Sequence, residues 1–373
     1  DGVLRVRYHR TATQRGAVGV RHPFQHLRKR GLTAYADQLT GRGCDRGSLG
    51  SGEIQLAVLR DRQSRYPRNE IRPELRPLLE VEGPTPGVPR GERVRQRAAV
   101  LGSPIEHSLS PALHRAAYAV LGLDWDYRAI ECTVEEFGDF FAGLGAEWRG
   151  LSLTMPLKEV AVDVVAEVSD VARLLQSANT IYRISPSEPW QATNTDVYGM
   201  EQALRESGVH SVRTCHVLGA GATARSALAA LAGLQAREVV IHARRRQAAE
   251  EVVALADGLG VRARAADLTP VDLSADLLVS TLPADAAAPW AEIGAEIGAD
   301  IGASSTMALL DVSYHPWPTP LAAAWLRKRP DAPVASGKDM LLWQALEQVR
   351  LMTGQGGNFD DAAVLQAMRG ALG

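Results

Sequence analysis

Short apolar runs alternate with amphipathic segments along the chain from about residue 97 onward. Residues 98–101 form a short apolar run, which predicts a buried strand, and two further strands are expected at residues 125–130 and 150–154. After Ser110 and Pro111, apolar residues recur at helical spacing, which predicts a helix with a serine cap and a proline in its first turn. A valine stripe over residues 160–175 predicts a further helix.

The same alternation continues through the second half of the chain. Strands are expected at residues 214–218, 238–242, 277–281 and 308–312. Helices are expected at residues 223–234, 248–259 and 341–352. Strands that alternate with helices predict a parallel, doubly wound sheet in an α/β protein.

The first 96 residues follow a different pattern and a different charge balance. Residues 1–95 hold 19 basic against 10 acidic side chains, whereas the whole chain has a net charge of −2. This segment shows no sustained periodicity, and a Pro/Gly-rich loop at residues 83–91 closes it. We expect residues 1–96 to be a basic leader that is either disordered or a non-native extension. A nucleic-acid-binding arm is the alternative, although the segment lacks interleaved aromatic residues that stack on bases.

Composition narrows the class of protein further. Hydrophobic residues make up 46 % of the 373 residues, which is enough for a sizeable core. No apolar run approaches the ~20 residues of a membrane span, and residues 1–30 hold no apolar core of a secretory signal. The three cysteines are far apart, form no metal-ligand spacing and fit a reducing cytoplasm. We therefore expect a cytoplasmic protein without a metal, a membrane or a nucleic-acid partner, acting as a monomer or homodimer.

A glycine turn follows the expected strand at residues 214–218 and opens the next helix. Its residues fit the pattern G-x-G-x-x-G/A of dinucleotide-binding folds, with a pyrophosphate on the helix N-terminus. The turn is formed by Gly219, Ala220, Gly221, Ala222, Thr223 and Ala224. A glycine turn in an unrelated α/β unit is the alternative interpretation.

The end of the following strand indicates which dinucleotide would bind. An NAD site commonly has an acidic residue there, but this chain has Arg244 and Arg245. Arginine side chains can pair with a 2′-phosphate, so NADP is favoured over NAD. A solvated basic turn is the alternative.

Lys158 and Asp196 are the candidate groups for proton transfer. Lys158 is one of four lysines among 41 basic residues. Lysine can release a proton when its surroundings lower its pKa, whereas arginine cannot. Together with a dinucleotide turn, the pair suggests proton transfer coupled to hydride transfer. The plain alternative for Lys158 is a surface lysine at a helix start.

Two hydroxyls, Ser108 and Ser110, lie two residues apart in a loop at a helix start. Hydroxyls and helix-terminal amides at such a place suit a carboxylate ligand. Simple helix capping by Ser110 explains the spacing equally well.

Seven short motifs follow one another along the chain: residues 102–111, 154–159, 178–180, 194–196, the glycine turn, 311–320 and 337–344. They occur in the order seen in shikimate dehydrogenases, and residues 97–366 resemble that family. The resemblance implies two lobes: a shikimate-binding lobe at residues 97–200, completed by residues 338–373, and a Rossmann-type NADP-binding lobe at residues 201–337.

The resemblance also implies roles for individual residues. Ser108 and Ser110 would hold the substrate carboxylate, and Tyr314 would lie near it and the nicotinamide. Thr154, Asn179 and Gln344 would bind ring hydroxyls. Lys158 and Asp196 would be the catalytic pair. One departure stands out, because the family usually has Asn where this chain has Ser152.

The expected reaction is therefore the NADPH-dependent reduction of 3-dehydroshikimate to shikimate, within chorismate and aromatic amino-acid biosynthesis. One alternative is a quinate/shikimate dehydrogenase with broader substrate and cofactor use. Another is a non-catalytic NADP-binding sensor on the same fold, against which the presence of both Lys158 and Asp196 argues.

Overall fold

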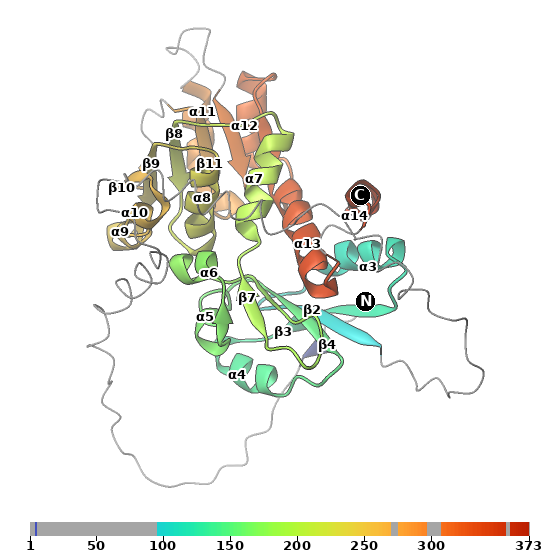
Figure 1. The fold of residues 1–373 in the computed structure, drawn as a ribbon. Coiled ribbons are helices and arrows are strands. Elements are labelled where there is room, and N and C mark those ends of the chain that lie inside the picture. The colour runs from blue at the N-terminus through green and yellow to red at the C-terminus, as the bar shows by residue number, and fades with distance from the viewer. Residues whose placement is uncertain (1–3, 6–94, 270–274, 297–306, 356–358, 373) are drawn as a thin grey trace, which may run out of the picture. The chain divides into compact units, whose positions relative to one another are not determined.

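The computed structural model describes residues 4–5, 95–269, 275–296, 307–355 and 359–372 (Figure 1). Most of the expected leader, residues 1–96, lies outside the described residues. Leu4 and Arg5 form β1, which pairs in parallel with the strand at residues 125–131. The strand expected from residue 98 begins two residues earlier, at Gln96.

A seven-stranded mixed sheet forms the first lobe, with strand order β1-β3-β2-β4-β6-β7-β5. Strand β2 lies between β3 and β4, and its residues from Ala98 onward are buried. Strand β6 pairs antiparallel with both β4 and β7, so this sheet is mixed. The further strands are β2 (Gln96–Gly102), β3 (Trp125–Glu131), β4 (Trp148–Leu153), β5 (Glu167–Val168), β6 (Thr180–Tyr182) and β7 (Gln191–Thr193).

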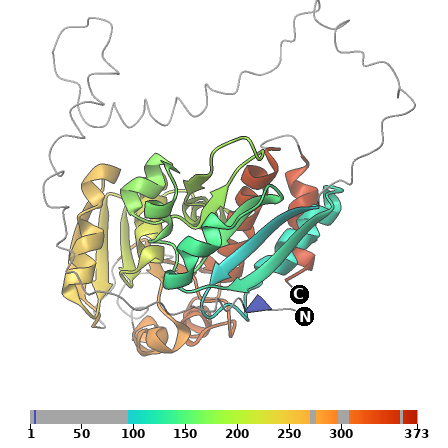
Figure 2. The same ribbon diagram turned by 90° about the horizontal axis from the view of Figure 1, so that it is seen from below.

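Helices cover both faces of this sheet (Figures 1 and 2). One face packs against α3 (Ser110–Val120) and two C-terminal helices, α13 (Gly337–Thr353) and α14 (Asp361–Gly370). The other face packs against α4 (Val134–Ala142) and the short α5 (Ala161–Val164) and α6 (Asp170–Leu175). The last two helices of the chain therefore return to the first lobe.

The prediction of a single helix at residues 160–175 is wrong. The segment forms α5, then β5, then α6, because Glu167 and Val168 pair with β7 instead of continuing the helix. Ser169 then restarts the helix, since its side chain accepts a hydrogen bond from the Ala172 amide. The valine stripe fits a helical period, but strand pairing overrides it.

The second lobe is a six-stranded, all-parallel sheet with strand order β10-β9-β8-β11-β12-β13. The parallel sheet expected from the alternation of strands and helices is confirmed here, and so is the α/β class with two lobes that the resemblance implies. The strands are β8 (Thr214–Leu218), β9 (Glu238–Ala243), β10 (Arg262–Asp267), β11 (Leu277–Ser280), β12 (Ala308–Asp311) and β13 (Val334–Ser336).

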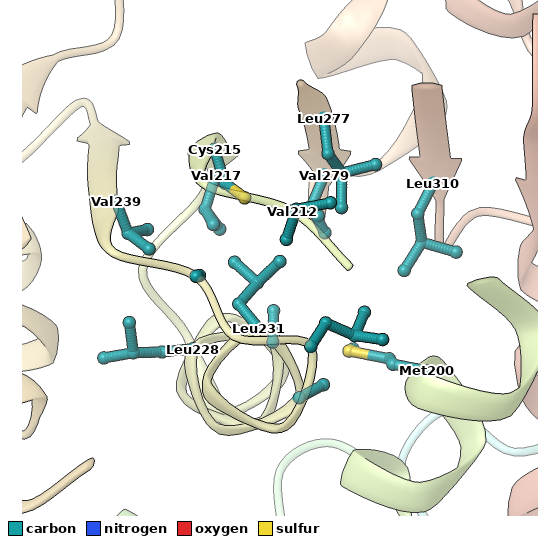
Figure 3. Close-up of a cluster of buried hydrophobic side chains, with 14 of the residues drawn as sticks. Met200, Val212, Cys215, Val217, Leu228, Leu231, Val239, Leu277, Val279 and Leu310 are labelled. Atoms are coloured by element: carbon teal, nitrogen blue, oxygen red, sulfur yellow. The ribbon is translucent and has the colours of Figure 1, made fainter. Parts of the chain in front are cut away.

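One face of the second sheet buries an apolar cluster against α7 (Asp196–Glu206) and α8 (Ala222–Gly233). Figure 3 shows Leu231 of α8 pointing toward Val217, with Leu228 on the side of Val239. The helix expected at residues 248–259 is interrupted, forming α9 (Arg246–Val253) and α10 (Ala256–Leu259). The opposite face packs against α11 (Ala284–Glu296) and α12 (Pro320–Lys328).

None of the helices in the described part of the chain has the length and apolar character needed to span a bilayer.

Candidate active site

An ion pair between Lys158 and Asp196 lies close to the carboxyl edge of the first sheet. Lys158 lies in the turn that follows β4, and Asp196 is the first residue of α7. The distance from Lys158 Nζ to Asp196 Oδ2 is 2.6 Å, and the two side chains are 14 % and 5 % exposed. The attraction is therefore less screened than on an open surface. Asp196 takes one of the three N–H donors of the lysine and fixes where the ammonium lies.

A buried asparagine holds the carboxylate of this pair. Asn179 Nδ2 donates to Asp196 Oδ1 at 2.8 Å, so both carboxylate oxygens accept a hydrogen bond. The side-chain oxygen of Asn179, Oδ1, accepts from the Thr195 amide at 2.7 Å and from Thr180 Oγ1 at 2.8 Å. Because its oxygen is engaged there, the asparagine presents its NH₂ group to Asp196 and to Gln344 Oε1, 3.3 Å away. The orientation of the carboxylate is thus determined by its neighbours.

The pair opens into a cavity of about 340 Å³ to which both lobes contribute. All eight residues that the sequence suggested for catalysis and substrate binding line this one cavity. They are Lys158, Asp196, Ser108, Ser110, Thr154, Asn179, Tyr314 and Gln344. Most follow the carboxyl ends of parallel strands, where α/β folds place their ligands. Burial raises the pKa of Tyr314, so its phenol stays protonated at neutral pH.

The role of Ser110 as a helix cap is not observed. Ser110 is the first residue of α3, Leu109 takes the cap position, and no side chain caps this end. Ser108 Oγ instead accepts from the Ser110 amide at 3.4 Å. Ser110 is buried and lines the cavity, and its side chain forms a hydrogen bond with Tyr127.

Two further polar residues line the cavity: Gln348, which the sequence did not suggest, and Ser152, which it singled out only as a departure from the family. Ser152 is on β4, two residues before Thr154, which follows the strand. Gln348 is on α13, four residues after Gln344. Those spacings place each residue on the same face as its predicted neighbour, which is the signal that could have identified them. Both side chains are buried, Ser152 with 4 % and Gln348 with 1 % of its surface exposed.

The glycine turn joins β8 to α8 as a dinucleotide site requires. Gly219 has φ +110°, and a Cβ there would lie 2.3 Å from Thr281 Oγ1. A Cβ on Gly221 would meet no atom within 4 Å among the described residues, so that side of the turn is open to a ligand. Ala224 is fully buried in the core between α8 and the sheet. Thr223 lines the cavity that holds the ion pair, so the turn and the pair lie at one site.

The two predicted arginines follow β9 at the same edge of the second sheet. Arg244 and Arg245 are exposed, whereas Ala243 before them is buried. Within the described part of the chain, neither guanidinium makes an ion pair, in contrast to the adjacent Arg246, which pairs with Glu250. The two cations are therefore available to an anionic ligand at the end of the strand.

His114 gives the folded protein a pH dependence below neutrality. Burial lowers its pKa from 6.5 to about 3, against a raising effect of the hydrogen bond with Gln348. Between these two values the unfolded chain binds a proton that the folded chain does not, so stability falls as pH decreases. We expect this one group to reduce the free energy of unfolding by about 2 kcal/mol at about pH 5 relative to about pH 7.

Urea unfolding at the two pH values measures this effect. In His114→Gln the decrease should be smaller by about that amount, whereas exposed His210→Gln should keep the wild-type decrease. An unchanged pH dependence in His114→Gln would contradict the assignment.

Comparison with known proteins identifies the family. Residues 100–181 match the shikimate dehydrogenase substrate binding domain. A shikimate dehydrogenase (NADP(+)) of Xanthomonas euvesicatoria is 34 % identical over 270 residues, which cover 69 % of this chain and 90 % of the relative. In two further relatives, from Thermosynechococcus vestitus and Prochlorococcus marinus, the chain spans about half of the length, 53 % and 54 %.

Solved structures agree with this match. The crystal structure of Mycobacterium tuberculosis shikimate dehydrogenase is 39 % identical, with a TM-score of 0.65 over 74 % of this chain and 99 % of that one. A Thermus thermophilus shikimate 5-dehydrogenase, solved in complex with NADP(H) and shikimate, is 29 % identical, with a TM-score of 0.59 over 74 % of this chain and 99 % of that one. The chain therefore belongs to the shikimate dehydrogenase family of oxidoreductases.

Proposed function

We propose that this protein catalyses the NADPH-dependent reduction of 3-dehydroshikimate to shikimate, on the route to chorismate and the aromatic amino acids. The observation that carries the proposal is the single cavity lined by the Lys158–Asp196 pair, a set of hydroxyls and amides, and Thr223 of the dinucleotide turn. A small polyol acid needs many polar partners, because each unmatched buried donor or acceptor costs ~1–3 kcal/mol.

The ion pair supplies the proton chemistry of this reaction. The glycine turn would hold NADPH, which when bound would supply a hydride to the carbonyl carbon. Lys158 Nζ donates a proton to the carbonyl oxygen, where negative charge develops, and is reprotonated from water. Asp196 keeps the lysine at the reacting oxygen and can accept a hydrogen bond from the neighbouring hydroxyl. Asn179 holds the carboxylate in that orientation throughout.

The remaining polar residues position the substrate. Ser108 and Ser110, with the amides at the start of α3, provide donors for the carboxylate. Thr154 and Gln344 bind ring hydroxyls, and Tyr314 approaches from the second lobe. Since these groups come from separate strands and helices, they fix the orientation of the ring as well as its place.

The residues present fit NADP as the dinucleotide. The positive φ at Gly219 and the open side of Gly221 let the backbone approach a pyrophosphate at the N-terminus of α8. Arg244 and Arg245 follow β9, and no acidic residue stands at that strand end to bind a 2′-hydroxyl, so the two arginines would hold the 2′-phosphate. Charge-assisted bonds from a guanidinium to a phosphate are short and strong.

Arg244→Ala should weaken NADP binding by roughly 1.5–3 kcal/mol, the scale of a hydrogen bond to a charged group. NAD binding should hardly change, because NAD lacks the 2′-phosphate. Calorimetric titration of both dinucleotides measures the two affinities. Arg246→Ala is the matched control, since Arg246 is an exposed arginine of the same segment that already pairs with Glu250. Equal weakening of both dinucleotides would make Arg244 a structural residue.

Initial rates test the proposed substrate and cofactor together. Shikimate and quinate are each offered with NADP⁺ and with NAD⁺. We expect shikimate with NADP⁺ to give the highest kcat/KM of the four combinations. Quinate turnover of similar efficiency would favour the broader quinate/shikimate activity, and no turnover in any combination would favour a non-catalytic protein.

We further propose a cytoplasmic enzyme that acts as a monomer or homodimer. Two of its three cysteines, Cys132 and Cys215, are buried free thiols, which is compatible with a reducing compartment.

A further inference from the structure

A chain of buried hydrogen bonds runs beneath the cavity from β3 to α3. Tyr127 OH lies 2.6 Å from Ser152 Oγ, which lies 2.8 Å from Gln348 Oε1. The Gln348 oxygen is also 3.2 Å from His114 Nε2, and His114 Nδ1 is 3.4 Å from Tyr118 OH. The rings of His114 and Tyr127 stack with centroids 3.9 Å apart. Ser152 and Gln348 are the members of this chain that line the cavity.

The hydrogen-bonding capacity of the Gln348 side chain is fully used inside the protein. Its NH₂ group donates to the backbone carbonyl oxygen of Asn179 at 3.3 Å and to Thr180 Oγ1 at 3.0 Å. Its oxygen accepts from Ser152 and from His114. An amide has two donors and two acceptor lone pairs, so no capacity is left for a ligand. The Asn179 backbone carbonyl also fixes the orientation of the Gln348 amide. If that amide were flipped, Gln348 Oε1 would face the Asn179 oxygen, and two acceptors would oppose each other.

This orientation decides the direction of every other bond in the chain. The Gln348 oxygen can only accept, so Ser152 must give its hydroxyl proton to Gln348. Tyr127 must then donate its own proton to Ser152. His114 must carry its proton on Nε2, with Nδ1 accepting from Tyr118. Burial lowers the pKa of His114 to about 3, which keeps the ring neutral and compatible with this arrangement.

One lone pair of Ser152 Oγ remains, and it is the only hydrogen-bonding capacity that this hydroxyl can offer to the cavity. An asparagine at this place, as the family usually has, would offer both a donor and an acceptor. We propose that Ser152 is a specificity-determining residue that only accepts a hydrogen bond, from a substrate hydroxyl, and that Gln348 and Tyr127 are positioning residues that impose this polarity. The substrate part of this inference rests on the proposed function.

The direction of the bonds can be tested without any substrate. Nitrogen chemical shifts of the ¹⁵N-labelled free protein, measured by NMR, distinguish the two tautomers of a neutral histidine. We expect His114 to be the Nε2–H tautomer at neutral pH, with its signals assigned by their loss in His114→Gln. The Nδ1–H tautomer would overturn the inferred network.

Substrate analogues test the polarity of Ser152. The non-reacting ring hydroxyls of shikimate are replaced one at a time by fluorine, which cannot donate a hydrogen bond. We expect one position at which fluorine raises the wild-type KM about five- to tenfold, which corresponds to the loss of one hydrogen bond. The change in kcat at that position should be smaller. In Ser152→Ala the KM for shikimate should rise by a similar factor, and the preference for hydroxyl over fluorine at that position should disappear.

The positioning role predicts a different signature in Gln348→Met and Tyr127→Phe. Gln348→Met frees the Ser152 proton, so the preference for hydroxyl over fluorine should decrease. Tyr127→Phe removes a hydrogen-bond partner of both Ser152 and Ser110 but leaves the Ser152 proton on Gln348. KM should therefore rise, and the preserved preference for hydroxyl over fluorine is the result that reports on Ser152. Leu346→Met, a substitution of a buried residue on α13, controls for altered packing. It should leave the KM for shikimate and the preference for hydroxyl over fluorine unchanged.

The possible outcomes separate the two proposals. If the preference for hydroxyl over fluorine at every ring position is the same in Ser152→Ala as in the wild type, the role of Ser152 is overturned. If that preference is unchanged in Gln348→Met, the role of Gln348 is overturned. Failure of the wild-type protein to oxidise shikimate would instead overturn the proposed function, and the tautomer measurement would still decide the direction of the bonds.

Discussion

Lys158→Ala is expected to lower kcat by roughly 10²–10⁴, the usual contribution of a positioned acid or base, with a smaller effect on KM. The reason is the geometry of the pair. Lys158 Nζ lies 2.6 Å from Asp196 and lines the cavity, so its loss removes the proton donor at the reacting oxygen. Steady-state kinetics with shikimate and NADP⁺ measure both constants.

A second lysine provides the control for this experiment. Lys328 lies at the exposed end of α12 and lines no part of the cavity, so Lys328→Ala should leave both constants unchanged. A near-normal kcat in Lys158→Ala would remove lysine from the mechanism.

Asp196→Asn should reduce kcat/KM by roughly 10³, through both kcat and KM. Both oxygens of Asp196 accept hydrogen bonds, one from the Lys158 ammonium and one from the Asn179 amide. An asparagine at this place must turn its NH₂ group toward one of these donors, so either the lysine or the amide loses its partner. The lysine is then no longer held at the reacting oxygen, and the contact with the substrate hydroxyl is lost.

The matched control is Asp163→Asn, which removes an exposed carboxylate from the neighbouring α5. It should leave kcat and KM unchanged. A substrate affinity unchanged in Asp196→Asn would show that Asp196 orients Lys158 without touching the substrate.

Local pattern predicts the strands of this fold well and its longer helices less well. Strands β8 and β9 lie at the expected residues to within one position, since short apolar runs between turn residues leave few alternatives. The break between α5 and α6 was not predictable, because it depends on β5 pairing with β7, which is a non-local contact. The antiparallel pairing of β6 has the same cause.

The site shows the same division between local motif and tertiary contact. Thr154 and Tyr314 were assigned from the family motifs, and Ser108 also from its place at a helix start. Each follows a strand, and the carboxyl ends of parallel strands meet at one edge of a sheet. The hydrogen bond between Ser152 and Gln348 was not predictable, because it forms only when α13 packs against the first sheet and brings residues that are far apart in the sequence together. Hydrophobic periodicity carries no information about such polar contacts.

Transfer of deuterium from labelled NADPH to 3-dehydroshikimate tests the central claim most directly. The wild-type protein is incubated with NADPH that carries deuterium at both C4 positions, and the product is examined by mass spectrometry and NMR. The account predicts shikimate with a single deuterium on the carbon that bears the new hydroxyl, formed far more slowly by Lys158→Ala. Shikimate without deuterium, or no reduction of 3-dehydroshikimate by the wild-type protein, would contradict it.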